Sequence, residues 1–142
     1  MLKKNKLLFV TVIFFYLLNF SHASENFFQE GKKKYEEKKY EDSKFLLQRS
    51  IVFNPKDTES YLYLAKIFNF QKNEKEEEKN INTVILLEPN NEEAIYMLMK
   101  IELKKSNYSK VKKLTKKFLK ICNTMCEKNK SILETLKSLE PK

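Results

Sequence analysis

Two prolines placed 34 residues apart constrain the fold of this chain more than any other feature. Pro55 and Pro89 each follow an apolar residue by two places and precede a turn-prone pair. Self-similarity at a fixed period indicates a repeat architecture, in which stacked copies of one unit bury a common core. Three further columns align at the same spacing: Glu25, Glu59 and Glu93; Phe28, Leu62 and Tyr96; Lys32, Lys66 and Lys100.

The apolar residues within each unit recur with a period near 3.6, which is typical of amphipathic helices. One Gly and three Pro in 142 residues leave little material for turns, which also favours helix over sheet. Helices of this length are marginal in isolation, so each must pack against its neighbours. The two stripes of the second unit are Tyr61, Leu64, Ala65 and Phe68, then Ile81, Val84, Ile85 and Leu87.

This pattern resembles the tetratricopeptide repeat, a helix-turn-helix of 34 residues. The resemblance implies an all-α, right-handed solenoid of three helical hairpins, at residues 24–57, 58–91 and 92–123. It also implies that small residues lie where two helices cross, a role open to Gly31, Ala65, Ser43 and Ser50. The second unit matches the motif at Tyr61, Leu64, Ala65, Phe68, Ile81 and Pro89, and the first at Phe27, Gly31, Tyr35, Tyr40, Leu47 and Pro55.

Three positions depart from the motif, and one more helix follows the third unit. Glu77 stands where a small residue is expected, so we expect the second hairpin to be looser there. Met99 replaces a small residue, and Asn123 stands in place of a closing proline. Residues 124–142 are expected to form a capping helix, the seventh helix in all, which covers the open end of the solenoid. Its apolar residues are Ile132, Leu133, Leu136 and Leu139.

Residues 1–23 have the features of a secretory signal peptide. Three lysines precede an apolar segment from Leu7 to Phe20, and Ala23 ends a run of small residues. Cleavage after Ala23 predicts an exported protein, either periplasmic or secreted. The alternative is an uncleaved anchor at residues 7–20, although these 14 residues are fewer than the roughly 20 that span a bilayer.

The charge of the chain points to a solvated helical surface. The formal net charge is +9 and falls to +6 when the leader is removed, because the leader holds three lysines and no acidic residue. Acidic and basic residues are mixed along the remaining sequence, and this pattern argues against a nucleic-acid partner. Membrane contact is expected only if the leader is retained.

The residue content argues against an enzyme. His22, the only histidine, lies in the leader, so the exported chain lacks the commonest general base and metal ligand. A single Gly excludes a glycine-rich phosphate loop. The acidic run at residues 74–78 has the character of a solvated helix face. We therefore expect no catalytic residue, no metal site and no cofactor.

Cys122 and Cys126 are the only cysteines, and export would place them in an oxidising compartment. In an unbroken helix, residues four apart are poorly placed for a disulfide. A helix end at Asn123 and Thr124 would bring the sulfurs together, and the closed loop would stabilise the fold by about 2 kcal/mol in the chain-entropy model. Two core thiols and a redox or intermolecular role remain open as alternatives.

The tetratricopeptide resemblance implies a concave groove, lined by the first helix of each hairpin, that holds peptides or partner helices. Three parallel rows, acidic, apolar and basic, would line this groove and bind a polypeptide by its side chains and charges. The same rows are also compatible with ordinary solvated surface and helix-dipole complementation. The predicted groove residues are Glu25, Phe28, Lys32, Tyr35, Glu59, Leu62, Lys66, Asn69, Glu93, Tyr96, Lys100 and Leu103.

The functional prediction is an exported scaffold or adaptor that binds a polypeptide partner, in envelope assembly or the organisation of a complex. One alternative is a basic surface protein that binds an anionic polymer, envelope lipid or nucleic acid. Another is a structural module that self-assembles through an open terminal repeat. The sequence does not identify the partner or choose the process, and it leaves the oligomeric state open.

Overall fold

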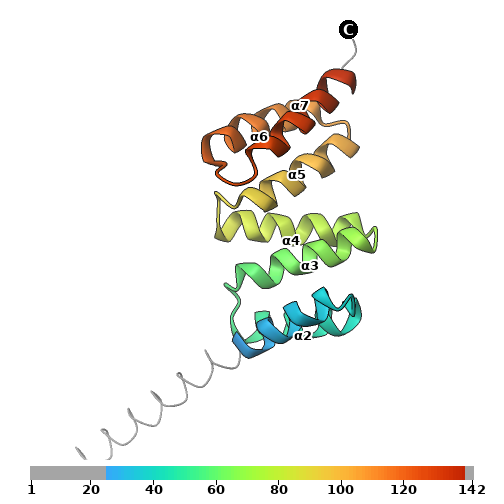
Figure 1. Cartoon of the computed structure of the whole chain (residues 1–142), viewed down its shortest axis with the longest axis vertical. Helices are drawn as coiled ribbons and strands as arrows, with labels where there is room; N and C mark the ends of the chain where they lie inside the picture. Colours follow the sequence, from blue (N-terminus) through green and yellow to red (C-terminus); the bar gives the residue numbers. More distant parts are fainter. Residues whose placement is uncertain (1–24, 140–142) are drawn as a thin grey trace, which may run out of the picture. The chain divides into compact units, whose positions relative to one another are not determined.

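The computed structural model describes residues 25–139, and every regular element in that range is a helix. The predicted signal peptide, with its apolar segment and cleavage point, lies outside the described residues. The prediction of an all-α fold built from seven helices is confirmed for the described range. The helices are residues 25–36, α2 (Tyr40–Phe53), α3 (Thr58–Phe70), α4 (Glu74–Leu87), α5 (Glu92–Lys104), α6 (Tyr108–Ile121) and α7 (Cys126–Leu139) (Figure 1).

The 34-residue period is written into the backbone of the interhelical turns. Lys38, Lys72 and Ser106 all have left-handed backbone, with φ of 61°, 57° and 57°. In each turn the N–H of this residue donates to the carbonyl three residues back, and the next N–H donates to the carbonyl five residues back. This hydrogen-bond pair ends a helix when the closing residue is left-handed. A side chain in that conformation costs about 1 kcal/mol, which glycine would avoid.

Side-chain caps begin the helices that follow several of these turns. Asn73 accepts a hydrogen bond from the Glu76 N–H at 3.3 Å, and Asn91 accepts one from the Ala94 N–H at 3.0 Å. At the start of α3, Asp57 accepts from the Ser60 N–H at 3.2 Å. These caps satisfy donors that a helix leaves unpaired at its first turn.

The described residues form two compact units, residues 25–63 (the first unit) and residues 64–139 (the second unit). In the first unit, a glycine allows the helix at residues 25–36 to approach α2 closely. A Cβ atom on Gly31 would lie 3.0 Å from Leu47 Cγ, and Leu47 is fully buried. The Ser43 hydroxyl donates to the Gly31 carbonyl at 2.8 Å. The close crossing predicted for Gly31 and Ser43 is therefore present.

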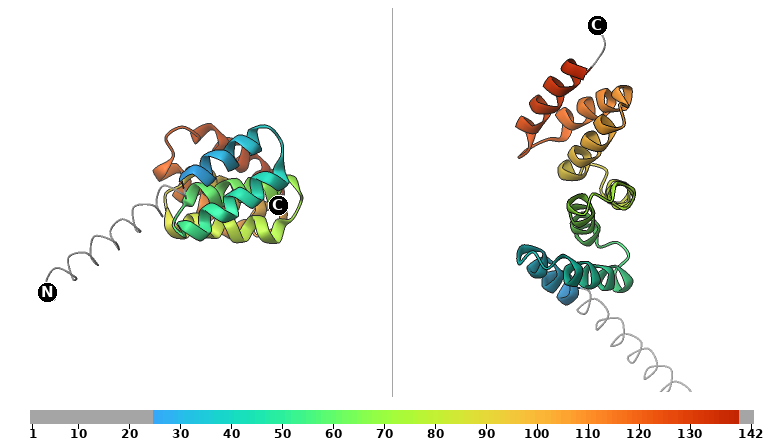
Figure 2. Two further views of the ribbon diagram at one scale, coloured as in Figure 1. Left: turned by 90° about the horizontal axis from the view of Figure 1, so that it is seen from below. Right: turned by 90° about the vertical axis from the view of Figure 1, so that its right-hand side faces the viewer.

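In the second unit, α5, α6 and α7 share one apolar core. Figures 1 and 2 show α7 beside α6, and α5 packs against both of them. Of the four apolar residues predicted for the last helix, Ile132 and Leu136 are buried, whereas Leu139 is 46% exposed. The buried residues of this core are Ile95, Met99, Val111, Phe118, Ile132 and Leu136.

The break between α6 and α7 brings the two cysteines together. Cys122 ends α6 with extended backbone, and Cys126 begins α7. Their sulfurs lie 2.16 Å apart and form a disulfide, with Cα atoms separated by 5.2 Å. The helix end predicted at Asn123 and Thr124 is the feature that makes this geometry possible. Helix α7 also begins 34 residues after α5, so it continues the register of the repeat.

We expect Gly31→Ala to destabilise the protein by about 1 kcal/mol. Overpacking against Leu47 costs about 1–3 kcal/mol, and better helix propensity recovers up to about 1 kcal/mol. Chemical denaturation followed by circular dichroism measures the difference in unfolding free energy. Glu30→Ala, at an exposed place in the same helix, is the matched control. A Gly31→Ala protein more stable than the wild type would show that the helices do not need this close approach.

Candidate functional site

Four aromatic rings gather in the first unit. Tyr63 of α3 lies between Phe28 and Tyr35 of the helix at residues 25–36, with ring centroids 6.0 and 5.1 Å away. Tyr40, the first residue of α2, meets Tyr35 at 5.6 Å. All these pairs are edge-to-face, an arrangement that aromatic quadrupoles favour. The four rings are only half-buried, so they combine packing with accessible aromatic surface.

The other predicted groove residues of the first unit differ in exposure. Glu25 is exposed and accepts a hydrogen bond from Gln29 at 2.8 Å, and Glu59 is also exposed. Lys32 is half-buried. Leu62 is only 4% exposed, so its side chain belongs to the core and offers little surface to a ligand.

Two predicted groove residues of the second unit form an ion pair. Lys66 Nζ on α3 lies 2.9 Å from Glu93 Oε2 on α5, with side chains 21% and 39% exposed. A partly exposed pair of this kind contributes little stability, on the order of 0–1 kcal/mol. It does join the acidic and basic rows at this point, whereas the sequence pattern predicts two separate rows.

Tyr96 of α5 lies between two lysine ammonium groups. Lys100 Nζ is 5.8 Å from the ring centroid, and Lys128 Nζ of α7 is 6.0 Å from it. Both distances lie within the range of a cation–π interaction. Leu103, also on α5, packs against the core of the second unit. Tyr96, Lys100 and Lys128 therefore form a half-buried aromatic ring with positive charge on two sides, here called the Tyr96 patch.

Glu77 occupies the helix crossing where the sequence led us to expect a looser hairpin. The side chain is buried, at 3% exposure, and Asn69 donates a hydrogen bond to it at 2.8 Å. Burial raises the pKa of Glu77, while the Asn69 hydrogen bond and the Lys104 and Lys100 charges oppose this shift. The crossing is closed by a buried carboxylate, which uses Asn69 of the predicted groove set as its partner.

Glu92 fastens the turn that joins α6 to α7. Its carboxylate accepts hydrogen bonds from the N–H groups of Asn123 at 2.8 Å, Thr124 at 3.2 Å and Met125 at 2.9 Å. Burial would raise the pKa of Glu92, but these backbone hydrogen bonds lower it below its ordinary value. The turn held by this carboxylate is the one enclosed by the disulfide.

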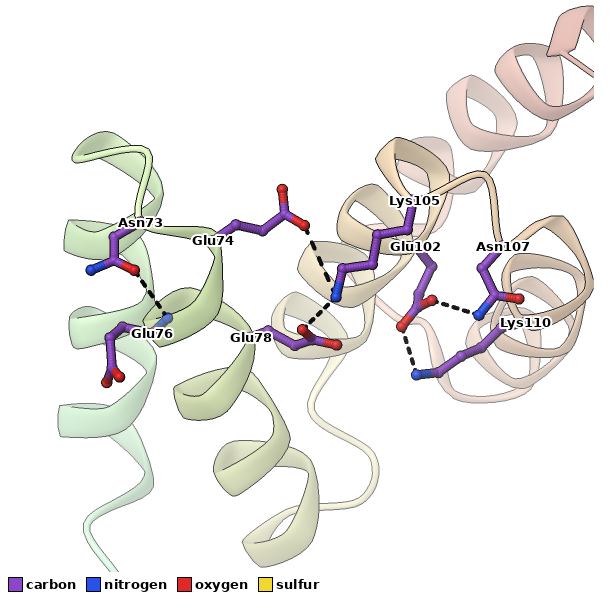
Figure 3. Close-up of polar contacts among 8 residues, drawn as sticks. All are labelled: Asn73, Glu74, Glu76, Glu78, Glu102, Lys105, Asn107 and Lys110. Atoms are coloured by element: carbon purple, nitrogen blue, oxygen red, sulfur yellow. Dashed lines mark hydrogen bonds and ion pairs between the residues drawn. The ribbon is translucent and has the colours of Figure 1, made fainter.

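A further set of charged contacts joins α4, α5 and α6 (Figure 3). Glu102 is 2% exposed and accepts hydrogen bonds from Asn107 at 2.9 Å and Lys110 at 2.6 Å. Lys105 donates to Glu78 at 2.5 Å, and this hydrogen bond raises the pKa of Lys105. These contacts tie successive helices of the second unit together at the ends that carry the turns.

Sequence reasoning missed several residues that complete these surfaces. Tyr63 follows Leu62, and the repeat alignment selected the leucine although tyrosine is the residue that favours a half-buried surface. Lys128 lies outside the three predicted hairpins. Glu92 precedes the aligned Glu93 and gave no signal, because its partners are backbone amides distant in the sequence.

Two searches of the described residues gave negative results. Within residues 25–139, His, Cys, Asp and Glu side chains do not gather in a group of three or more that could hold a metal ion. No helix within this range has the length and apolar character needed to cross a membrane.

Comparison with known proteins identifies the fold. No protein-family model matches the sequence, and no curated protein matches it. Among solved structures, the Arabidopsis OM64 TPR domain aligns with a TM-score of 0.71 and 17% identity, covering 82% of this chain and 96% of that one. The first TPR of Spaghetti (RPAP3), bound to the HSP90 peptide SRMEEVD, aligns at 0.73 and 14%, covering 84% and 97%.

A bacterial structure gives the same result. The Yersinia enterocolitica type III secretion chaperone SycD, in complex with a peptide of the translocator YopD, aligns with a TM-score of 0.69 and 13% identity. It covers 80% of this chain and 89% of that one. At these identities the likeness concerns the fold alone. The chain has the tetratricopeptide-type fold of successive helical hairpins.

Two glutamates should change stability in opposite directions. Because the pKa of Glu92 is lowered, its contribution is present above the ordinary value of 4.5 and is lost as pH falls through the folded-state pKa. Glu92→Gln should therefore lower the melting temperature at neutral pH, and the difference should vanish in acid. Because the pKa of Glu77 is raised, the native state loses stability as pH rises above 4.5 through the raised value. Glu77→Gln should raise the melting temperature at neutral pH.

Thermal unfolding of the wild type and both variants across a pH series measures these differences. The Glu77→Gln advantage should shrink as pH falls towards 4.5, since the wild-type carboxyl is then protonated. Differences that keep one size at every pH would contradict both assignments.

Proposed function

We propose that this chain is an exported scaffold that binds a polypeptide partner. The observation that carries the proposal is the Tyr96 patch, where a half-buried ring is accompanied by the ammonium groups of Lys100 and Lys128 within 6.0 Å. An aromatic face contacts apolar side chains, and the two lysines attract carboxylates. The partner segment best suited to it carries apolar and acidic side chains close together.

The proposal makes use of the position of this patch on a first helix. In the tetratricopeptide fold the first helices of the hairpins contact bound peptides. RPAP3 and SycD, which share the fold, are each solved with a bound peptide. The likeness supports a polypeptide ligand for this chain without specifying its sequence.

The first unit contributes a second candidate contact surface. Phe28, Tyr35 and Tyr63 are half-buried and rigidly packed against one another. Aromatic anchors give large contact area with little loss of side-chain entropy on binding, which is why they dominate interface energetics. In this proposal Leu62 supports the surface from the core instead of touching the ligand.

The role we propose is that of a binding protein without catalysis. The buried carboxylates of the second unit have structural partners: Glu77 accepts from Asn69, and Glu102 accepts from Asn107 and Lys110. The cysteines are joined to each other. We extend the proposal to the compartment, in which this disulfide suits an exported protein.

Peptide selection tests the binding role. Peptides selected from a displayed random library on the wild-type protein should be enriched in acidic and apolar residues. Lys100→Glu should weaken them at least tenfold in calorimetry, because the charge beside the ring is reversed. Tyr96→Ala should weaken them as much, with circular dichroism showing retained helix.

Lys75→Glu is the matched control, since Lys75 is an exposed lysine on α4 and the charge change is the same. It should leave affinity within about twofold, as expected for a charge far from the interface. Peptides that bind both charge variants as well as the wild type would place the ligand elsewhere on the molecule.

Intact mass of the chain, expressed in an exporting host and measured without reduction, tests the compartment. We expect the mature protein to begin at Ser24 and to lack the two hydrogens that disulfide formation removes. A full-length chain in the membrane fraction would support the anchor at residues 7–20 instead. Two free thiols in the exported protein would contradict a disulfide at Cys122 and Cys126.

A further inference from the structure

Helix α6 concentrates positive charge, unlike the mixed pattern expected for the chain. Its 14 residues contain six lysines and no acidic residue. Lys110 is paired with the buried Glu102, and Lys117 is half-buried. The four others are exposed on one side of the helix: Lys112, Lys113, Lys116 and Lys120.

These four lysines share a face with one exposed apolar side chain. At 3.6 residues per turn, positions 112, 113, 116, 119 and 120 fall within a sector of about 120°. Leu119 belongs to this sector and is 58% exposed. We call these five residues the α6 face. The opposite side of α6 carries Val111, Thr115 and Phe118, all buried, so the core fixes which way the α6 face points.

Exposure at these places of the repeat does not by itself require lysine. The repeat supplies an internal comparison, because α2 and α4 hold the equivalent places 68 and 34 residues earlier. The equivalents of the four lysines sum to no net charge in α4 and to one positive charge in α2. They are Glu78, Lys79, Asn82 and Leu86 in α4, and Lys44, Phe45, Gln48 and Val52 in α2.

The lysines of the α6 face repel one another. Lys112 and Lys116, and Lys116 and Lys120, are four residues apart, and Lys113 and Lys116 are three apart. Like charges at these spacings destabilise a helix by about 0.2–0.5 kcal/mol per pair. Helix α6 has no acidic residue of its own to offset this, and it is held in place by its buried side. A dense anionic surface would relieve the repulsion on contact.

We propose that the α6 face docks on an anionic phospholipid surface. A bilayer presents many headgroup charges in one plane, which suits a row of ammonium groups on a single helix face. Lysine is a flexible point charge, whereas readout of nucleic-acid bases and phosphates favours arginine, and the one arginine of the chain, Arg49, lies on α2. Leu119 lies among the lysines, where it enters the headgroup layer. This contact is independent of the polypeptide site and does not need the leader to be retained.

Lysine footprinting on the full chain tests the proposal. The protein is acetylated in the presence of phosphatidylcholine vesicles with and without phosphatidylserine, and each lysine is quantified by mass spectrometry. Lys112, Lys113, Lys116 and Lys120 should react severalfold more slowly on phosphatidylserine vesicles. Exposed lysines elsewhere, such as Lys33, Lys56 and Lys75, should keep their reactivity. Because the readout is local, any membrane contact of residues 7–20 is common to both vesicle types.

Two charge-matched variants accompany the footprint. Replacing the four α6 lysines by Gln should abolish the gain in binding that phosphatidylserine produces, since each lysine near such a surface contributes roughly fivefold in affinity. Replacing Lys33, Lys56, Lys75 and Lys137 by Gln removes the same charge and should leave most of that gain. Leu119→Ser should reduce binding to phosphatidylserine vesicles with no change in its salt dependence.

Three results would overturn the proposal. They are equal reactivity of the α6 lysines on both kinds of vesicle, equal loss of binding in the two charge-matched variants, and stronger protection of the α6 lysines by duplex DNA than by phosphatidylserine vesicles at the same phosphate concentration. The last result would assign the α6 face to nucleic acid.

Discussion

Burial of one apolar stripe per helix against the next helix is the interaction on which this structure depends. The helices are 13 or 14 residues long from α2 onwards, too short to persist alone in water. In the second unit Phe118, Ile95 and Met99 are fully buried together, and each comes from a helix whose other side faces solvent. The 34-residue turn geometry serves this burial, because it returns the chain at the same point in every hairpin.

The polar interior of the second unit follows from that packing. Where two helices cross closely, a carboxylate is tolerated only if donors reach it, and Asn69 supplies one for Glu77. Glu92 acts differently, because its carboxylate lies among three backbone N–H groups at the start of α7. Two acidic residues of one helical array thus have pKa values shifted in opposite directions by burial and by hydrogen bonding.

The surfaces left after packing differ in chemistry. The first unit presents half-buried aromatic rings, and the Tyr96 patch presents one ring with lysines beside it. The α6 face presents lysines with a single leucine. A scaffold that holds a polypeptide at one face and an anionic surface at another would bring the two together, and the fold allows this because each helix turns only one side inward.

Much of the fold could be predicted from the sequence. The period of 34 residues, the helical apolar spacing and the scarcity of Gly and Pro together determined an array of helical hairpins, because backbone hydrogen bonding and apolar burial then have one consistent solution. The small residues at Gly31 and Ser43 also marked a close helix crossing correctly, since only small side chains allow two helix backbones to approach.

The candidate site was only partly predictable. Aligned columns identify equivalent positions in a repeat, but they do not say how far each side chain is buried or which neighbour it meets. Packing therefore decided that Leu62 is core and Tyr63 is surface, that Lys66 pairs with Glu93, and that Lys128 joins Tyr96. The sequence by itself determined the helices and their period, which depend on local spacing. Only the tertiary structure decided the surfaces and the partners of Glu77 and Glu92, because those contacts join residues that the chain brings together by folding.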